Sequence, residues 1–282
     1  MALDNKLEET LRSAEMHAKV GRAVAMESCV HAAELYAHNA GYDISERVSD
    51  LKRIGYNNQI LVMIEKAEEM ADAGKPIAVA SCFSIASIYA KKADMAISLL
   101  LQDAKYIFMK SYENAVPVEL EKARNLGKLG RITAMQTTLL TAQRYASMVG
   151  QTIPEEVINE ITMSGYNRAI PLELEDARTY AASGRVMHMY VSIAFALKYA
   201  RNFGAGIYAI VKAEVAEIKQ RCLENAIPLE LDIARTMVEE GNILGAEFHL
   251  STARDYVNSA NQPLDGVNEV RQLIQATLFH HA

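Results

Sequence analysis

Apolar residues recur along the whole chain at the spacing of α-helices. Leu174, Ala177 and Ala181 stand three and then four positions apart, which places them on one side of a helix with about 3.6 residues per turn. Met135 and Leu139 begin a second stripe of the same kind. No window shows the alternation of apolar and polar residues that is typical of a half-buried strand. The pattern predicts an all-α protein with about fifteen helices and no sheet.

Five glycines mark a repeat in this pattern. They are Gly21, Gly74, Gly130, Gly184 and Gly241, which are 53, 56, 54 and 57 residues apart. Ten residues before each glycine stands a leucine or isoleucine, seven before it an alanine, and twelve after it another alanine. Fifteen residues after each glycine stands a tyrosine: Tyr36, Tyr89, Tyr145, Tyr199 and Tyr256. This agreement predicts a single helical-repeat domain over 1–282, with five units of about 55 residues at approximately 1–55, 56–111, 112–165, 166–222 and 223–282.

Each unit is expected to contain three helices. The repeated glycine suits the C-terminal end of the first helix, where a left-handed residue costs least without a Cβ. A second set of turn residues, twenty positions later, ends the second helix: Gly41, Asp94, Gly150, Gly204 and Asn261. The third helix is expected to end at turns that begin at Gly55, Ser111, Gly165 and Cys222. Prolines 117, 171 and 228 follow three of these turns and predict the first turn of the next unit.

Each unit has an apolar side that only its neighbour can cover, so the units are expected to stack in a line as an α-solenoid. A right-handed superhelical array is the preferred arrangement, and a closed bundle in two halves is the alternative. The layout resembles the α-solenoid class, with tetratricopeptide and armadillo-like arrays as examples, in the glycine between paired helices and in the Ala-x-x-Tyr-Ala pattern such as Ala196 to Ala200. The period is longer than a tetratricopeptide unit, and the chain has no tryptophan. The resemblance implies a scaffold or binding surface and carries over no site residue.

Composition agrees with a large helical core. Half of the residues are hydrophobic and 23% are charged, which is enough apolar surface to bury. The net charge of −6 argues against broad attraction to phosphate backbones. The three cysteines form no close pair, the N-terminus has no apolar signal segment, and no apolar run is long enough to span a bilayer. A cytoplasmic protein without a membrane segment is expected.

Candidate chemistry is sparse. The chain has no nucleophile–base set, phosphate loop, dinucleotide fingerprint or zinc-type cysteine spacing, so neither an enzyme nor a cofactor is expected. Glu27, His31, Glu34 and His38 share one helix face, and residues of these types at this spacing ligate divalent metals in other proteins. The equivalent positions of the third and fifth units are mostly polar as well. A solvated polar face is therefore preferred, and no metal site is predicted.

A row of arginines is the candidate for binding anions or nucleic acid. It consists of Arg124, Arg131, Arg178, Arg185 and Arg235. Three of these residues follow a carboxylate by three positions, at Glu121, Glu175 and Asp232, so salt links within one helix are the preferred interpretation. The tyrosine column is predicted to pack in the core, with a platform for stacked bases as the alternative.

Two helix faces depart from the polar pattern and are the predicted partner-binding surface. They carry Ala80, Ser84 and Ser87 in the second unit and Tyr190, Ala194 and Leu197 in the fourth. If exposed, such faces suit docking by a protein partner or by a second copy of the chain; if the array bends, its own helices bury them. The predicted function is a non-enzymatic interaction scaffold or adaptor that self-associates. The alternative is an RNA- or ribosome-associated factor that uses the arginine row.

Overall fold

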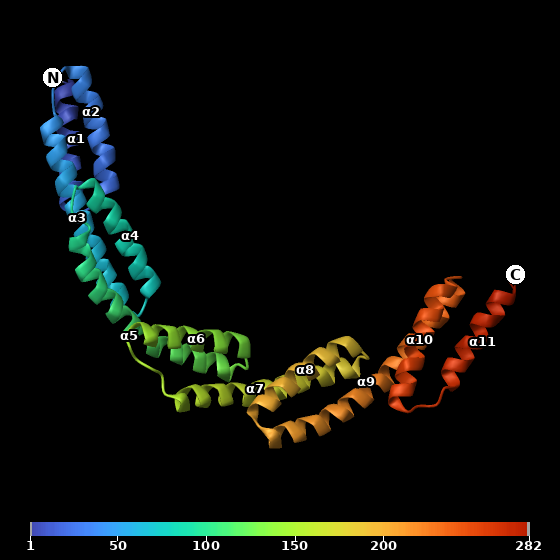
Figure 1. Ribbon diagram of the computed structural model, residues 1–282. Helices are drawn as coiled ribbons and strands as arrows, with labels where there is room; N and C mark the ends of the chain where they lie inside the picture. The colour runs from blue at the N-terminus through green and yellow to red at the C-terminus, as the bar shows by residue number, and fades with distance from the viewer. Residues whose placement is uncertain (1, 281–282) are drawn as a thin grey trace. The chain divides into compact units, whose positions relative to one another are not determined.

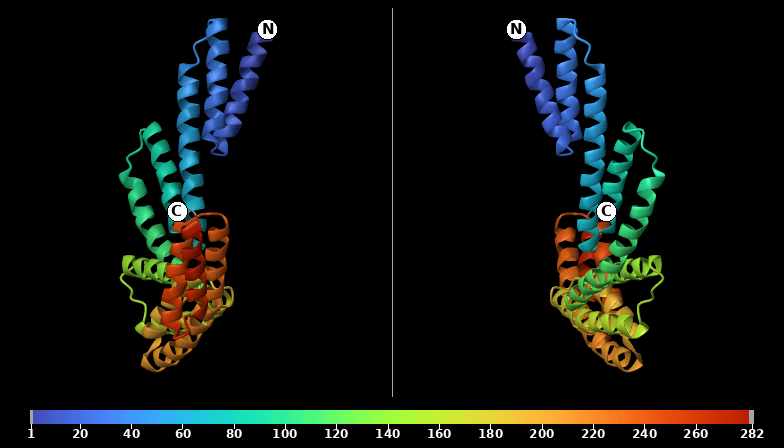
Figure 2. Two further views of the ribbon diagram at one scale, coloured as in Figure 1. Left: turned by 90° about the vertical axis from the view of Figure 1, so that its right-hand side faces the viewer. Right: turned by 90° about the vertical axis from the view of Figure 1, so that its left-hand side faces the viewer.

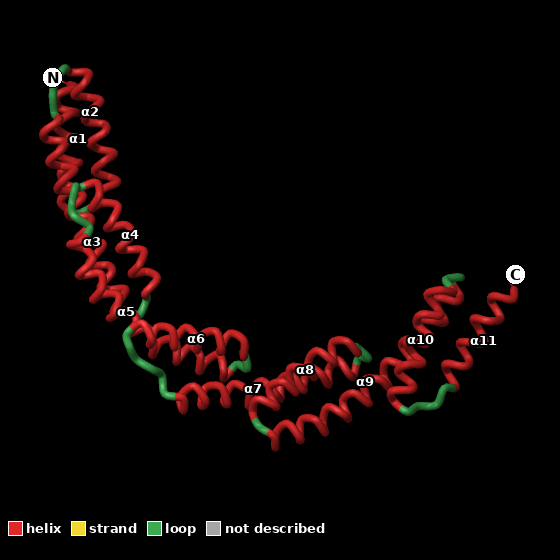
Figure 3. The backbone as a smooth tube through the Cα atoms, viewed as in Figure 1, coloured by secondary structure: helices red, strands yellow, loops and turns green. Residues whose placement is uncertain are grey.

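The computed structural model describes residues 2–280, and within this range every regular element is an α-helix (Figure 3). The prediction of an all-α fold without strands is confirmed for these residues. The eleven helices are α1 (Ala2–Lys19), α2 (Ala23–Ala40), α3 (Ser45–Asp72), α4 (Pro76–Lys92), α5 (Ser98–Lys128), α6 (Ile132–Met148), α7 (Glu155–Ala182), α8 (Val186–Phe203), α9 (Ala205–Glu239), α10 (Ile243–Ala260) and α11 (Asp265–His280).

The helices form two compact units, which are described separately. The first contains Met1–Lys122 and Thr138–Pro154, and the second contains Ala123–Thr137 and Glu155–Ala282. In the first unit, α1 pairs with α2, α3 pairs with α4, and α3 also packs on α1 and α2 (Figures 1 and 2). In the second, α7 pairs with α8, α9 pairs with α10, and α9 also packs on α7 and α8. Helices α3 and α9 thus each belong to one hairpin and also cover the hairpin before it, as expected for helical repeats.

Both sets of predicted turn residues adopt the backbone conformation that their positions require. The five repeated glycines have φ between 63° and 75°. The second set also has positive φ throughout, including the two residues that are not glycine, Asp94 at 55° and Asn261 at 52°. Asparagine and aspartate tolerate this region better than other side chains, because their short polar groups bond to the local backbone. The helix ends at these turns are therefore confirmed.

The predicted ends of the third helices are wrong. Helix α3 continues through Gly55, α5 through Ser111, α7 through Gly165 and α9 through Cys222. The three prolines lie inside α5, α7 and α9 rather than in a first turn. What looked like two helices is one long helix, so the described chain has eleven helices instead of about fifteen.

Tertiary packing explains why these small residues do not end a helix. A Cβ built on Gly55 would lie 2.4 Å from Sδ of Met26, and one on Gly165 would lie 2.5 Å from Sδ of Met135. Met26 and Met135 are fully buried and stand five residues after their turn glycines. The glycine therefore makes room for a methionine of the preceding hairpin, and the helix gains more from this packing than it loses in propensity.

An asparagine on the long helix fixes the hairpin turn in three places. The side-chain amide of Asn58 donates to the carbonyl of Ala18 at 3.0 Å, and Asn114 makes the same bond to Ala71 and Asn225 to Ala181, each at 3.0 Å. Each accepting carbonyl belongs to the last turn of the first helix of a hairpin and also accepts the backbone N–H of the turn glycine three residues later. These bonds tie the end of one helix to the next long helix.

The repeated alanines form the core, as predicted. The alanines seven before and twelve after each glycine are all fully buried: Ala14, Ala67, Ala123, Ala177, Ala234, Ala33, Ala86, Ala142, Ala196 and Ala253. Three of the column tyrosines pack their rings on a tyrosine of the preceding long helix. The pairs are Tyr56–Tyr89, Tyr112–Tyr145 and Tyr166–Tyr199, with ring centroids 5.8, 5.4 and 5.7 Å apart. The column is thus a packing feature of the repeat.

Candidate interaction surface

The predicted polar stripe on α2 lies within a cluster of opposite charges. The hydroxyl of Tyr56 on α3 donates to Oε1 of Glu27 at 2.8 Å, and Nζ of Lys92 on α4 donates to the same oxygen at 2.6 Å. The ammonium group of Lys92 also lies 5.5 Å from the ring centroid of Tyr56 and 5.4 Å from that of Tyr89. We call Glu27, Tyr56, Tyr89 and Lys92 the N-terminal tyrosine cluster.

These contacts shift the titration of both oxygen groups. Burial raises the pKa of Glu27, but the hydrogen bonds from Lys92 and Tyr56 outweigh it, so the pKa lies below its ordinary value. Burial and the hydrogen bond to the Glu27 carboxylate both raise the pKa of Tyr56. The cluster therefore favours an ionised Glu27 and a neutral Tyr56.

The two carboxylates of this stripe form ion pairs with lysines. Glu27 is held by Lys92, and Oε1 of Glu34 lies 3.3 Å from Nζ of Lys52. Over the part of the chain that the structure describes, no three histidine, cysteine or acidic side chains are grouped so that they could hold a metal ion. The stripe links α2 to α3 and α4 by ion pairs.

The predicted arginine row is engaged by carboxylates at two positions. Nη1 of Arg178 lies 3.0 Å from Glu175, and Nη1 of Arg235 lies 2.8 Å from Asp232, as the spacing predicted. Both guanidinium groups also reach the next long helix, Arg178 to Glu214 and Arg235 to Glu269. Arg131 and Arg185 are exposed at the starts of α6 and α8, and Arg124 takes part in a polar or ionic contact. The paired arginines link successive helices and neutralise part of the row.

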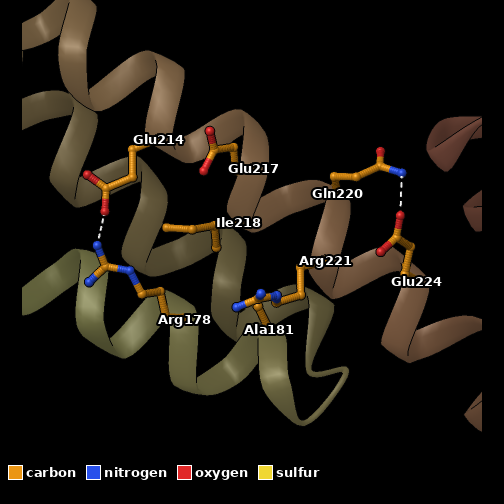
Figure 4. A pocket seen from close by; sticks show the side chains of 8 residues that line it. All are labelled: Arg178, Ala181, Glu214, Glu217, Ile218, Gln220, Arg221 and Glu224. Atoms are coloured by element: carbon orange, nitrogen blue, oxygen red, sulfur yellow. Dashed lines mark hydrogen bonds and ion pairs between the residues drawn. The ribbon is translucent and has the colours of Figure 1, made fainter.

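A polar groove of about 510 Å³ lies beside Arg178, between α7 and α9 (Figure 4). Its lining carries both signs of charge, on Arg178, Arg221, Glu214, Glu217 and Glu224, and is completed by Gln220, Ala181 and Ile218. Gln220 donates to Glu224 at 2.7 Å. These side chains offer mixed polar contacts of both signs to a ligand.

The predicted partner-binding residues lie at or near the surface of α4 and α8. Ala80, Ser84 and Ala194 are exposed, Ser87 and Leu197 are half-buried, and Tyr190 is 40% exposed. The ring of Tyr190 is shielded on one side by Lys219, whose ammonium lies 5.1 Å from the ring centroid. The six residues thus fall on two separate helices, and Ser87 bonds back to the carbonyl of Phe83 on its own helix.

Large apolar side chains are exposed on an adjacent stripe that the sequence interpretation missed. On α8 they are Met187, Val191 and Phe195, at 74%, 55% and 42% exposure. The equivalent stripe on α10 begins with Leu244 and Phe248, at 81% and 68% exposure. These positions stand three, seven and eleven residues after the turn glycine. The recurrence of an apolar residue at the third position, with Val24 and Ile77 as further examples, was visible in the sequence.

No protein-family model, curated protein or solved structure matches the chain. None of the helices that the structure describes is at once long and apolar enough to cross a membrane.

Proposed function

We propose that this protein is a non-enzymatic interaction scaffold that self-associates through the exposed apolar stripes of its hairpins. The observation that carries the proposal is the stripe on α8, where Met187, Val191 and Phe195 lie uncovered on three successive turns. Large apolar side chains that adjoin one another at the surface of a soluble domain are typical of protein-binding sites. The cytoplasm is the proposed compartment, on the odd number of cysteines.

The repeat architecture supports the same proposal. The five units are interpreted as an α-solenoid in which the third helix of each unit and the first helix of the next form one continuous helix. Repeat arrays of this kind bury a continuous core between neighbours and leave one helix of each unit available to partners. The stripes of α8 and α10 belong to such helices, since both follow a turn glycine at the same offsets.

Binding to RNA through the arginine row is the less supported candidate. The carboxylates of Glu175 and Glu214 already surround Arg178, and a phosphate would have to displace them. An association of this protein with nucleic acid would weaken steeply with added salt, because bound counterions are released. Self-association through apolar stripes would change little with salt.

Sedimentation velocity of the full chain tests the proposal. Over an about hundredfold range of protein concentration, the average mass is expected to rise from monomer to a defined oligomer. This rise should persist in high salt. A monomer at every concentration would contradict self-association.

A further inference from the structure

The stripes of α8 and α10 are both apolar, but their charged surroundings are opposite. Helix α8 contains no acidic residue, and Arg185, Lys198 and Arg201 stand along it. At the fourth position of the stripe, fourteen residues after the turn glycine, α8 has Lys198 and α10 has Asp255. The two helices come from consecutive hairpins of the same unit of the structure.

The apolar stripe of α10 is bordered by carboxylates. Glu240 precedes the helix, Glu247 stands beside Phe248, and Asp255 ends the stripe; all three side chains are exposed. Arg254, the only basic residue in α10 besides His249, lines the groove against α11 together with Glu247 and Arg271, so the carboxylates at the two ends of the stripe are Glu240 and Asp255. The stripe itself therefore combines Leu244 and Phe248 with acidic neighbours.

Three charges at these stripes have no partner within the described residues. Among residues 2–280, Lys198, Glu240 and Asp255 take part in no ion pair or side-chain hydrogen bond that the structure records. Arg201, in contrast, donates to the hydroxyl of Tyr208. The carboxylates of α2 differ, since Glu27 and Glu34 are already bound by lysines. An apolar stripe with unpaired basic ends and another with unpaired acidic ends are complementary surfaces.

From this complementarity we infer that α8 of one copy packs against α10 of a second copy, and that the contact is formed twice in a closed dimer. A twofold arrangement uses each stripe once and doubles the buried area, which a single short stripe needs to reach the size of a specific interface. With the two helices antiparallel, Lys198 lies near Glu240 at one end, and Asp255 lies near Arg185 at the other. This inference rests on the proposed function and names the partner surface.

Single substitutions at the most exposed apolar positions test the two halves of the contact. Met187→Glu on α8 and Phe248→Lys on α10 are each expected to weaken dimerisation of the full chain by at least about tenfold, because each buries a charge near charges of the same sign. Ile77→Glu on α4 is the matched control, since Ile77 is 78% exposed and Met187 is 74% exposed. The control should dimerise within about twofold of the wild type. Circular dichroism and thermal unfolding establish that all three variants fold.

Mixing the two variants distinguishes the proposed contact from a symmetric one. In a mixed dimer, the wild-type α10 of the Met187→Glu copy meets the wild-type α8 of the Phe248→Lys copy, and the two substituted helices bring opposite charges together. The mixture is therefore expected to dimerise more tightly than either variant alone. Pairing of α8 with α8 gives no such recovery, so a mixture without recovery overturns the inference.

Charge exchange supplies a second, independent measurement. Lys198→Glu alone and Glu240→Lys alone are expected to weaken the dimer severalfold, and the double variant is expected to regain most of the affinity. Full additivity of the two losses would overturn the pairing. Suppose that every α8 and α10 variant associates as tightly as the wild type, whereas Ile77→Glu does not. Self-association would then stand, but the contact between α8 and α10 would be overturned. A wild type that stays monomeric overturns both.

Discussion

The N-terminal tyrosine cluster has an equivalent in the second of the two compact units, where uncharged side chains bond to the tyrosine hydroxyl. Its members are Gln136, Tyr166, Tyr199 and Asn202, which we call the central tyrosine cluster. Nε2 of Gln136 and Nδ2 of Asn202 donate to the Tyr166 hydroxyl at 3.2 and 3.3 Å. In the N-terminal cluster the corresponding positions are Glu27 and Lys92, and the tyrosine hydroxyl donates instead of accepting.

The geometry of the two clusters is nearly identical while the polar chemistry differs. The tyrosine rings lie 5.8 Å apart in the N-terminal cluster and 5.7 Å apart in the central one. The buried tyrosine on the long helix is 8% exposed in the first and 5% in the second. Ring packing between a long helix and the next hairpin is therefore the shared requirement. The polar partners have to satisfy the hydroxyl, and both a charged and a neutral pair do this.

The largest expected difference lies at the glycine turns next to the clusters. A Cβ at Gly21 would lie 2.8 Å from the backbone oxygen of Asn58, whereas one at Gly130 would lie 2.8 Å from the tip of the Leu172 side chain. Both have positive φ, which costs an alanine about 1 kcal/mol, but only the leucine can move aside. We expect Gly21→Ala to lower the free energy of unfolding by about 3 kcal/mol and Gly130→Ala by about 1 kcal/mol.

Urea denaturation measures the free energy of unfolding of both variants. The reactivity of the buried thiols shows the opening of each of the two compact units separately. Cys82 lies in the first unit and Cys222 in the second, so pulsed alkylation shows which unit opens. Gly150→Ala is the control, because its φ is 70° but no atom lies within 4 Å of the added Cβ. Equal losses for Gly21→Ala and Gly150→Ala would contradict the role of the close backbone.

Removing the tyrosine hydroxyls is expected to have the next largest effect. Tyr56→Phe deletes a hydrogen bond to a carboxylate and should cost about 1.5–2 kcal/mol, whereas Tyr166→Phe deletes neutral bonds and should cost about 1 kcal/mol or less. The same denaturation experiment measures both. A larger loss for Tyr166→Phe would reverse the comparison.

Acid should destabilise the N-terminal cluster more than the central one. The folded pKa of Glu27 is depressed, so its contribution is fully present above the unfolded pKa of about 4.5 and is lost as the pH falls through the lower folded value. The loss should stay below about 1 kcal/mol because the pair is partly exposed. The Glu27→Gln, Lys92→Asn double variant, which copies the central cluster, should lose this part of the acid dependence. An identical pH profile for wild type and double variant would refute the assignment.

Salt is expected to have the smallest effect. Raising the ionic strength to about 1 M should weaken the Glu27–Lys92 pair by a few tenths of a kcal/mol, because exposed ion pairs are screened. The double variant should show no such contribution. Comparing urea midpoints of the two proteins at low and high salt measures the difference.

The repeat and its buried positions were predictable from the sequence. At positions such as Ala14 and Ala67 two helix axes approach closely, so only a small side chain fits. An alanine therefore recurs at the same position of every repeat. The turn glycines and Asn261 were predictable for the same reason, since few residues adopt positive φ. These features depend on local sterics and on a periodicity that five copies reinforce.

Helix continuity was decided by tertiary structure. Gly55 and Pro117 each favour a helix end when considered alone, yet both lie inside long helices. Met26 fills the space above Gly55, and Pro117 is exposed while its neighbour Ala115 is buried. A local propensity of about 1 kcal/mol for glycine, or about 3 kcal/mol for proline, is outweighed by burial along 28 or 31 residues.

Which apolar face remains uncovered was also decided by tertiary structure. Met187 and Met189 stand two residues apart on α8, with 74% of the first exposed and the second fully buried. Met189 stands at the same offset from its turn glycine as the buried Met26 and Met135, so the repeat indicated its burial, but the exposure of Met187 depends on how α7 and α9 lie around α8. The sequence determined the repeat, the helices' turns and the buried small residues, because each depends on local backbone geometry and close contact repeated five times. The long helices and the exposed stripes depend on where neighbouring helices lie, which no single segment specifies.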